Sequence, residues 1–137
     1  MNLLRSASRV SVFGLALGLA LLPFSVLAAG DDPIVGRWSG QVTEQNGGDN
    51  SKYPVTIQFD SPNHGTTDYS TLKCGGELTG SRTAGGTYSY AEKIKSGDCT
   101  DGGHLEVKLV NHDTISILWS TQPGSKDDTV SGTLTRQ

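Results

Sequence analysis

Two cysteines, each followed closely by paired glycines, are the residues of this chain that point most directly to chemistry. They stand in the runs Cys74-Gly75-Gly76 and Cys99-Thr100-Asp101-Gly102-Gly103. In a chain with an export signal, two cysteines are expected to form one disulfide, because exported proteins fold in an oxidising compartment. Free thiols or half of a metal site are the weaker interpretation, since neither cysteine has a His or a second Cys at ligand spacing. We therefore predict a Cys74–Cys99 bond.

Glu92 occupies an unusual position for a carboxylate. Strand-like alternation through Tyr88, Tyr90 and Glu92 places it on the same face as two aromatic rings. A buried carboxylate needs hydrogen-bond donors or a cation, and a tyrosine, Arg136 or Lys73 could supply them. One hypothesis is a polar group at the mouth of a barrel that orients a ligand. The interpretation that we favour from sequence is a bulge that turns Glu92 outward, or a structural ion pair.

Aromatic residues supply further groups for ligand contact. Tyr53 and Tyr69 lie near the ends of expected strands, so we predict that they are accessible. Tyr88 and Trp119 are expected to fill the core. The candidate ligand-binding residues are Tyr53, Tyr69, Tyr90 and Glu92.

The sequence contains no recognisable set of catalytic residues. None of the three histidines lies in a serine or cysteine nucleophile motif, and they are not spaced as metal ligands. The loop around Asp101 lacks the repeated acidic spacing of calcium loops, so Asp101 is assigned a structural role, accepting hydrogen bonds from backbone amides. Glu77 and Glu92 as a glycosidase pair are a distant alternative. We predict no enzyme activity, no cofactor and no metal.

The first 28 residues have the three parts of a secretory signal. A positively charged start and an apolar run are followed by Val26-Leu27-Ala28 at the peptidase positions, so cleavage after Ala28 is expected, with Ala29 as the alternative. A retained membrane anchor is the weaker interpretation, because the apolar run is short for a span of about 20 residues. Residues 29–33 are predicted to be a flexible lead-in, and residues 34–137 a single domain.

Charge argues against two classes of partner. The chain has 14 acidic and 11 basic residues, a formal net charge of −3, and the signal segment contains two arginines and no acids. The acidic surface of the mature protein repels phosphate backbones and anionic lipid. We therefore expect no nucleic-acid partner and no membrane after signal cleavage. The expected protein is periplasmic or secreted, and its partner is an unknown small ligand or an envelope or extracellular protein.

Short strands must position these residues. After residue 33, runs rich in Val, Ile, Thr and Tyr alternate apolar and polar residues between Gly, Asn, Asp, Ser and Pro clusters. Short connections force antiparallel neighbours, and about eight strands are expected to close into an up-and-down barrel that leaves no exposed edge. A two-sheet sandwich is the alternative. The predicted strands are residues 34–43, 53–60, 66–71, 77–82, 86–95, 104–110, 114–121 and 129–136.

Gly36-Arg37-Trp38 on the first strand and Arg136 near the end of the last strand resemble the end-sealing device of lipocalin-type barrels. In that device an arginine of the final strand stacks on a tryptophan of the first strand. The resemblance implies an all-β, lipocalin-like barrel. It gives Trp38 and Arg136 a structural role in contact with each other at a closed end.

A longer series of motifs covers almost the whole chain after the signal. It is similar to a bacterial extracytoplasmic domain of secreted proteins, which also forms the outer portion of some actinobacterial Ser/Thr protein kinases and has no assigned activity. The resemblance implies sensing or binding and nothing about chemistry. The motifs are Gly36-x-Trp38-x-Gly40, Tyr53-Pro54-Val55, Tyr69-x-x-Leu72-x-Cys74-Gly75-Gly76-x-Leu78, Tyr90-x-Glu92-x-Ile94, Gly97-x-Cys99-x-Asp101-Gly102-Gly103 and Gly132-x-Leu134-x-Arg136.

The sequence therefore predicts a secreted, non-catalytic binding module for a small ligand, or a sensor. The alternative is a protein-binding module, such as an inhibitor of an envelope-targeting enzyme, and a small hydrolase is a distant third. Interior volume should distinguish the first two, since a cavity of about 300 Å³ or more favours a ligand and a packed interior favours binding through loops. Modest apolar content slightly favours a filled interior.

Overall fold

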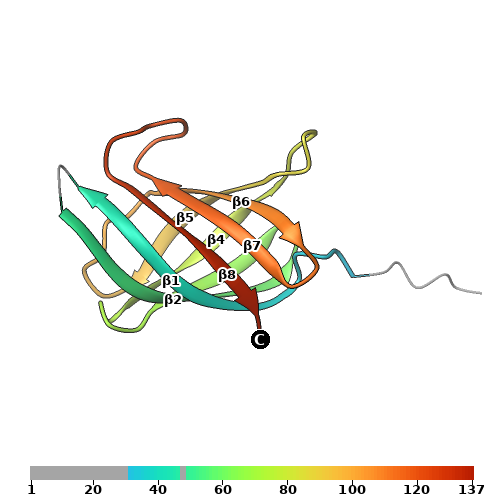
Figure 1. Cartoon of the computed structure of the whole chain (residues 1–137), viewed down its shortest axis with the longest axis horizontal. Coiled ribbons are helices and arrows are strands. Elements are labelled where there is room, and N and C mark those ends of the chain that lie inside the picture. The colour runs from blue at the N-terminus through green and yellow to red at the C-terminus, as the bar shows by residue number, and fades with distance from the viewer. Residues whose placement is uncertain (1–30, 47–48) are drawn as a thin grey trace, which may run out of the picture.

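Eight antiparallel strands form a closed barrel in the computed structural model, which describes residues 31–46 and 49–137 (Figure 1). The strands follow one another around the barrel in chain order, and β1 pairs with β8 to close it. The predicted up-and-down barrel is confirmed, and the sandwich is excluded. The strands are β1 (Gly36–Asn46), β2 (Asp49–Ser61), β3 (His64–Tyr69), β4 (Cys74–Arg82), β5 (Tyr88–Ser96), β6 (His104–Asn111), β7 (Thr114–Ser120) and β8 (Thr129–Arg136).

Two strands begin well before their predicted starts. β2 begins at Asp49 rather than Tyr53, and β4 begins at Cys74, which pairs with Tyr69 of β3. Polar residues and glycines conceal these starts, because backbone pairing rather than apolar burial places them in the sheet. The predicted signal peptide, residues 1–28, lies outside the described residues. Within the part that is described, no helix is long and apolar enough to cross a bilayer.

One face of each strand supplies the core. Alternation along β2 buries Val55, Ile57 and Phe59, and alternation along β6 buries Leu105 and Val107, as the sequence pattern predicts. The largest side chains without solvent exposure are Trp38, Tyr88, Tyr90 and Phe59.

Trp38 and Arg136 seal the end of the barrel at which β1 begins and β8 ends. The guanidinium carbon of Arg136 lies 4.1 Å from the Trp38 ring centroid, so the contact expected from the sequence is present. Arg136 also donates from Nη1 to the carbonyl of Val35 at 2.8 Å and from Nη2 to that of Pro33 at 2.7 Å. Gly36 allows this approach, because its φ is +137° and a Cβ there would lie 2.5 Å from Arg136 Nη1.

The segment before β1 packs against the same end. Asp32 Oδ1 accepts hydrogen bonds from the Tyr88 hydroxyl at 2.5 Å and from the Ile34 amide at 3.0 Å. Ile34 has no solvent exposure, and its carbonyl accepts the Trp38 indole N–H at 2.8 Å. The described part of the lead-in predicted to be flexible, residues 31–33, therefore contains side-chain and backbone groups bonded to the barrel.

Connections between strands alternate between the two ends of the barrel. The β3–β4, β5–β6 and β7–β8 connections lie at one end, where β1 also ends and β2 begins, and we call this the open end. The β2–β3, β4–β5 and β6–β7 connections lie at the other end, with residues 31–35. In Figure 1 the β7–β8 connection and residues 31–35 lie on opposite sides of the barrel.

Candidate functional site

A cavity of about 220 Å³ lies at the open end. Its apolar floor includes Val42, Leu105, Ile117 and Val130, which come from β1, β6, β7 and β8. The volume is below the 300 Å³ expected of an open ligand binder, yet the interior is not filled throughout. The barrel is packed at the sealed end and hollow at the open end.

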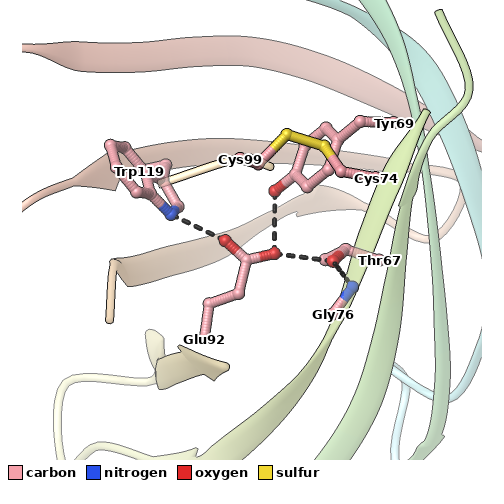
Figure 2. The surroundings of a disulfide bond; sticks show 7 residues. All are labelled: Thr67, Tyr69, Cys74, Gly76, Glu92, Cys99 and Trp119. Carbon is pink, nitrogen blue, oxygen red and sulfur yellow. Dashed lines mark hydrogen bonds between the residues drawn. A yellow bond between two sulfur atoms is a disulfide. The ribbon is translucent and has the colours of Figure 1, made fainter. Parts of the chain in front are cut away.

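Glu92 belongs to the lining of this cavity, and its carboxylate points toward Thr67, Tyr69 and Trp119 (Figure 2). It is only 3 % exposed. Its Oε1 accepts hydrogen bonds from Thr67 Oγ1 at 2.6 Å and from the Tyr69 hydroxyl at 2.9 Å, and its Oε2 accepts one from Trp119 Nε1 at 2.8 Å. No ion pair involves Glu92 among the described residues. The favoured interpretation from sequence, an outward turn or an ion pair, is therefore wrong, and a tyrosine donor is present.

Each partner of Glu92 acts as a donor. Thr67 Oγ1 accepts the amide N–H of Gly76 at 3.0 Å, which leaves the Thr67 hydroxyl hydrogen for the carboxylate. An indole nitrogen can only donate. A carboxylate offers about four acceptor positions, and two donors meet Oε1 while one meets Oε2. Among the described contacts, one acceptor position on Oε2 is therefore left for a ligand.

Three strands that are distant in the sequence bring this group together. Thr67 and Tyr69 lie two residues apart on β3, so both point inward, while Glu92 lies on β5 and Trp119 near the end of β7. The Glu92 amide donates to the carbonyl of Gly103 at 2.8 Å. Gly103 must be glycine here, because a Cβ would lie 2.1 Å from Trp119 Nε1. The second of the paired glycines after Cys99 thus makes room for the indole.

The disulfide fixes one side of the cavity. Cys74 at the start of β4 is bonded to Cys99 in the β5–β6 connection, as predicted, with their Cα atoms 6.0 Å apart. Cys99 also lines the cavity, and Figure 2 shows the bond beside the Tyr69 ring. The bond therefore holds the β5–β6 connection against β4 at the cavity rim.

Asp101 holds the other part of the same connection. Its Oδ1 accepts the backbone N–H of Ile94 at 2.8 Å, and its carboxylate pairs with Lys93. The hydrogen bond from Lys93 lowers the pKa of Asp101, and the Ile94 amide adds to this effect. Asp101 therefore fastens its loop to β5, the structural role expected from the sequence.

Tyr53 and Tyr69 both line the cavity and contact each other. Their ring centroids are 6.2 Å apart in an edge-to-face arrangement. Burial raises the pKa of Tyr53 to about 12, and Glu44 adds to this effect. Burial also raises the pKa of Tyr69, and the negative charge of Glu92 raises it further. Both hydroxyls therefore stay protonated at neutral pH and remain donors.

Tyr90, the remaining aromatic candidate, is not brought to the cavity. Its ring is fully buried 5.1 Å from that of Phe59, and its hydroxyl donates to the Pro62 carbonyl at 3.0 Å near the sealed end. The possible glycosidase pair is not brought together either. Glu77 is exposed on the outer face of β4 and pairs with Lys95 at 3.1 Å, whereas Glu92 points inward.

Sequence reasoning missed Thr67 and Trp119 as partners of Glu92. Trp119 has the same parity as Ile115 and Ile117 and was assigned to the core, yet it is only partly buried and lines the cavity. Its place near the open end of β7 was the available signal. The sequence contained no signal for Thr67, because threonine is common in strands.

No protein-family model, curated protein or solved structure matches this chain. The closed eight-stranded antiparallel barrel with one disulfide is therefore the established description. The resemblances to lipocalin-type barrels and to the bacterial extracytoplasmic domain remain predictions from the sequence. In residues 31–46 and 49–137, no group of three or more His, Cys, Asp or Glu side chains is arranged to hold a metal ion.

Proposed function

We propose that this chain is a non-catalytic binding module that takes one small ligand into its open-end cavity. The observation that carries the proposal is a buried carboxylate in an apolar and aromatic cavity, with one acceptor position unfilled. Small-molecule sites are commonly built as apolar hollows with a few convergent polar groups. Glu92 would orient the ligand, and the floor of the cavity would bind its apolar body.

The cavity volume sets the size of the ligand. A protein cavity of about 150 Å³ can bind benzene, and drug-sized molecules need about 300 Å³ or more. The cavity of about 220 Å³ lies between these values. The proposed ligand is therefore a molecule of roughly one substituted ring.

The disulfide indicates an oxidising compartment outside the cytoplasm. A periplasmic or secreted location is part of the proposal and agrees with the signal peptide that the sequence predicts. A protein partner is the second candidate function. It is favoured by Leu72, a cavity-lining residue of the β3–β4 connection whose side chain is 46 % exposed.

Calorimetric titration of the oxidised protein with single-ring compounds of positive, zero and negative charge tests the proposal. We expect at least one compound to bind. Val130→Phe should abolish binding, because Val130 is only 7 % exposed and its larger replacement enters the cavity. Val110→Phe is the matched control, since Val110 is 59 % exposed and is not among the residues that line the cavity.

Binding that survives in folded Val130→Phe would place the ligand elsewhere. Absence of binding by every compound in the set would contradict the small-ligand proposal and favour the protein-binding alternative. Thermal unfolding of both variants shows whether each has retained its fold. The two valine variants introduce the same side chain, so a difference between them reports on the cavity.

A further inference from the structure

We infer that the ligand of the open-end cavity is an organic cation, an ammonium group on a small apolar body. This inference rests on the proposed function and adds the chemical class of the ligand. It stands on the charge, the rings and the hydrogen-bond donors of the described residues around the cavity.

All charged side chains in the described lining of the cavity are acidic. Glu44, Asp98 and Glu92 contribute carboxylates, and no Lys, Arg or His belongs to the described lining. Several carboxylates around a cleft with low-dielectric walls produce a negative potential that concentrates cations. A positively charged ligand is therefore attracted to this cavity, and an anion is repelled.

Glu92 carries the strongest part of the inference. It is almost completely buried and has no cationic partner among the described residues, although a buried carboxylate is costly without one. Its unfilled acceptor position lies on Oε2. An ammonium N–H bonded there would form a charge-assisted hydrogen bond and supply the missing opposite charge.

The donors around Glu92 are unsuited to an anion. Thr67, Tyr69 and Trp119 already donate to the carboxylate, so their hydrogens are committed. An anionic or strongly accepting ligand would have to break these bonds next to a like charge. A donor-bearing ligand uses the free acceptor position without disturbing them.

Three aromatic rings complete the arrangement. Tyr53, Tyr69 and Trp119 line the same cavity as the acids. Faces of tyrosine and tryptophan rings attract cations, and ammonium recognition by clustered rings is a common use of this interaction. The rings also pack against an apolar body, so the same cavity can accommodate both parts of a small amine.

Three compounds of one size but different charge test the inference: phenethylamine, phenylethanol and phenylacetate. We expect phenethylamine to bind at least about tenfold more tightly than phenylethanol, and phenylacetate to bind most weakly. Added sodium chloride should weaken binding of the amine and leave that of the alcohol unchanged. Calorimetric titration of the oxidised protein measures all three affinities.

Charge-removing variants locate the effect. Glu92→Gln should reduce the affinity for phenethylamine about tenfold and that for phenylethanol by a smaller factor, because the alcohol loses a charged hydrogen-bond acceptor but no opposite charge. Asp98 is an exposed residue of the cavity lining, so Asp98→Asn should fold and test the effect of negative charge on binding even if Glu92→Gln unfolds. It should weaken amine binding by a smaller factor. Glu77→Gln, on the outer face of β4, is the matched control and should change neither affinity.

The results separate the inference from the proposed function. Equal affinities for the amine and the alcohol, or tightest binding of phenylacetate, would overturn the inference while leaving a small-ligand site in place. Amine binding that is unaffected by Asp98→Asn and by a folded Glu92→Gln would also overturn it. If none of the three compounds binds, the inference and the small-ligand function both fail.

Discussion

The indole N–H of Trp119 donates to Oε2 of Glu92 at 2.8 Å and thereby joins β7 to β5 at the open-end cavity. Thr67 and Tyr69 of β3 meet the other oxygen of the same carboxylate. Glu92 therefore links three strands that do not pair with one another. The contribution of these hydrogen bonds to stability and the ability of Glu92 to bind a ligand can be measured separately.

Glu92→Gln should lower the free energy of unfolding by about 1–3 kcal/mol. The amide retains one oxygen as an acceptor, but its NH₂ group then faces a donor, either Trp119 or the Thr67 and Tyr69 pair. Urea denaturation measures the loss. The double variant Glu92→Gln, Trp119→Phe should lose less stability than the sum of the two single variants. In the double variant the amide NH₂ group can face the phenylalanine position, where no donor remains. Strict additivity would contradict the hydrogen-bonded arrangement.

Trp38→Ala should lower the free energy of unfolding by about 3–5 kcal/mol, because a large and fully buried ring is lost. The variant also removes the ring beneath the Arg136 guanidinium. Arg37→Ala is a suitable control, since Arg37 is an exposed neighbour on the same strand. A Trp38→Ala protein as stable as Arg37→Ala would contradict the seal described at this end of the barrel.

Much of this architecture could be predicted from the sequence because it depends on local patterns. Alternation in segments such as 55–59 and 105–107 identified the inward face, and β8 was predicted from Thr129 to Arg136, as observed. The Trp38–Arg136 contact followed from a motif at the two ends of the barrel. The polar start of β2 at Asp49 was missed, since nothing in its composition indicates a strand.

The candidate site was predicted only in part, because it depends on contacts between distant strands. Parity placed Glu92 on the inner face, but an outward bulge or a structural ion pair was favoured, because a shift of one residue in a strand moves a side chain to the other face. The actual partners are neutral donors, of which Thr67 and Trp119 have no sequence signature as carboxylate ligands. Tyr90 was included because it shares parity with Glu92. Parity does not show which end of a barrel a residue lies near.

Loss of the disulfide should lower the free energy of unfolding by roughly 3 kcal/mol, because the bond closes a loop with a sequence separation of 25 residues. The measurement is urea denaturation of a Cys74→Ser, Cys99→Ser double variant against the oxidised protein. Ligand affinity should also fall, since Cys99 lines the cavity and its loop is held by the bond. Unchanged affinity in the folded double variant would show that the loop keeps its position without the bond.

Stability should fall at alkaline pH. The pKa of Tyr53 is raised to about 12, and that of Tyr69 is also raised, relative to about 10 in an unfolded chain. Because the folded state disfavours the ionised form, this stabilisation is fully present below about pH 10 and is lost as pH rises through about 12. Tyrosinate absorbance and urea denaturation across this range test it. A native titration with all tyrosines near pH 10 would contradict the burial described.

The two indole N–H signals in a nitrogen-15 NMR spectrum test the central claim most directly, because the chain contains only two tryptophans. The Trp38 indole is bonded to Ile34 at the sealed end, and the Trp119 indole is bonded to Glu92 in the cavity. Phenethylamine and phenylethanol are titrated separately, and Trp119→Phe assigns the signals. A ligand in the open-end cavity predicts a saturable shift of the Trp119 signal with an unchanged Trp38 signal. A Trp119 signal that stays in place with both compounds would contradict the claim.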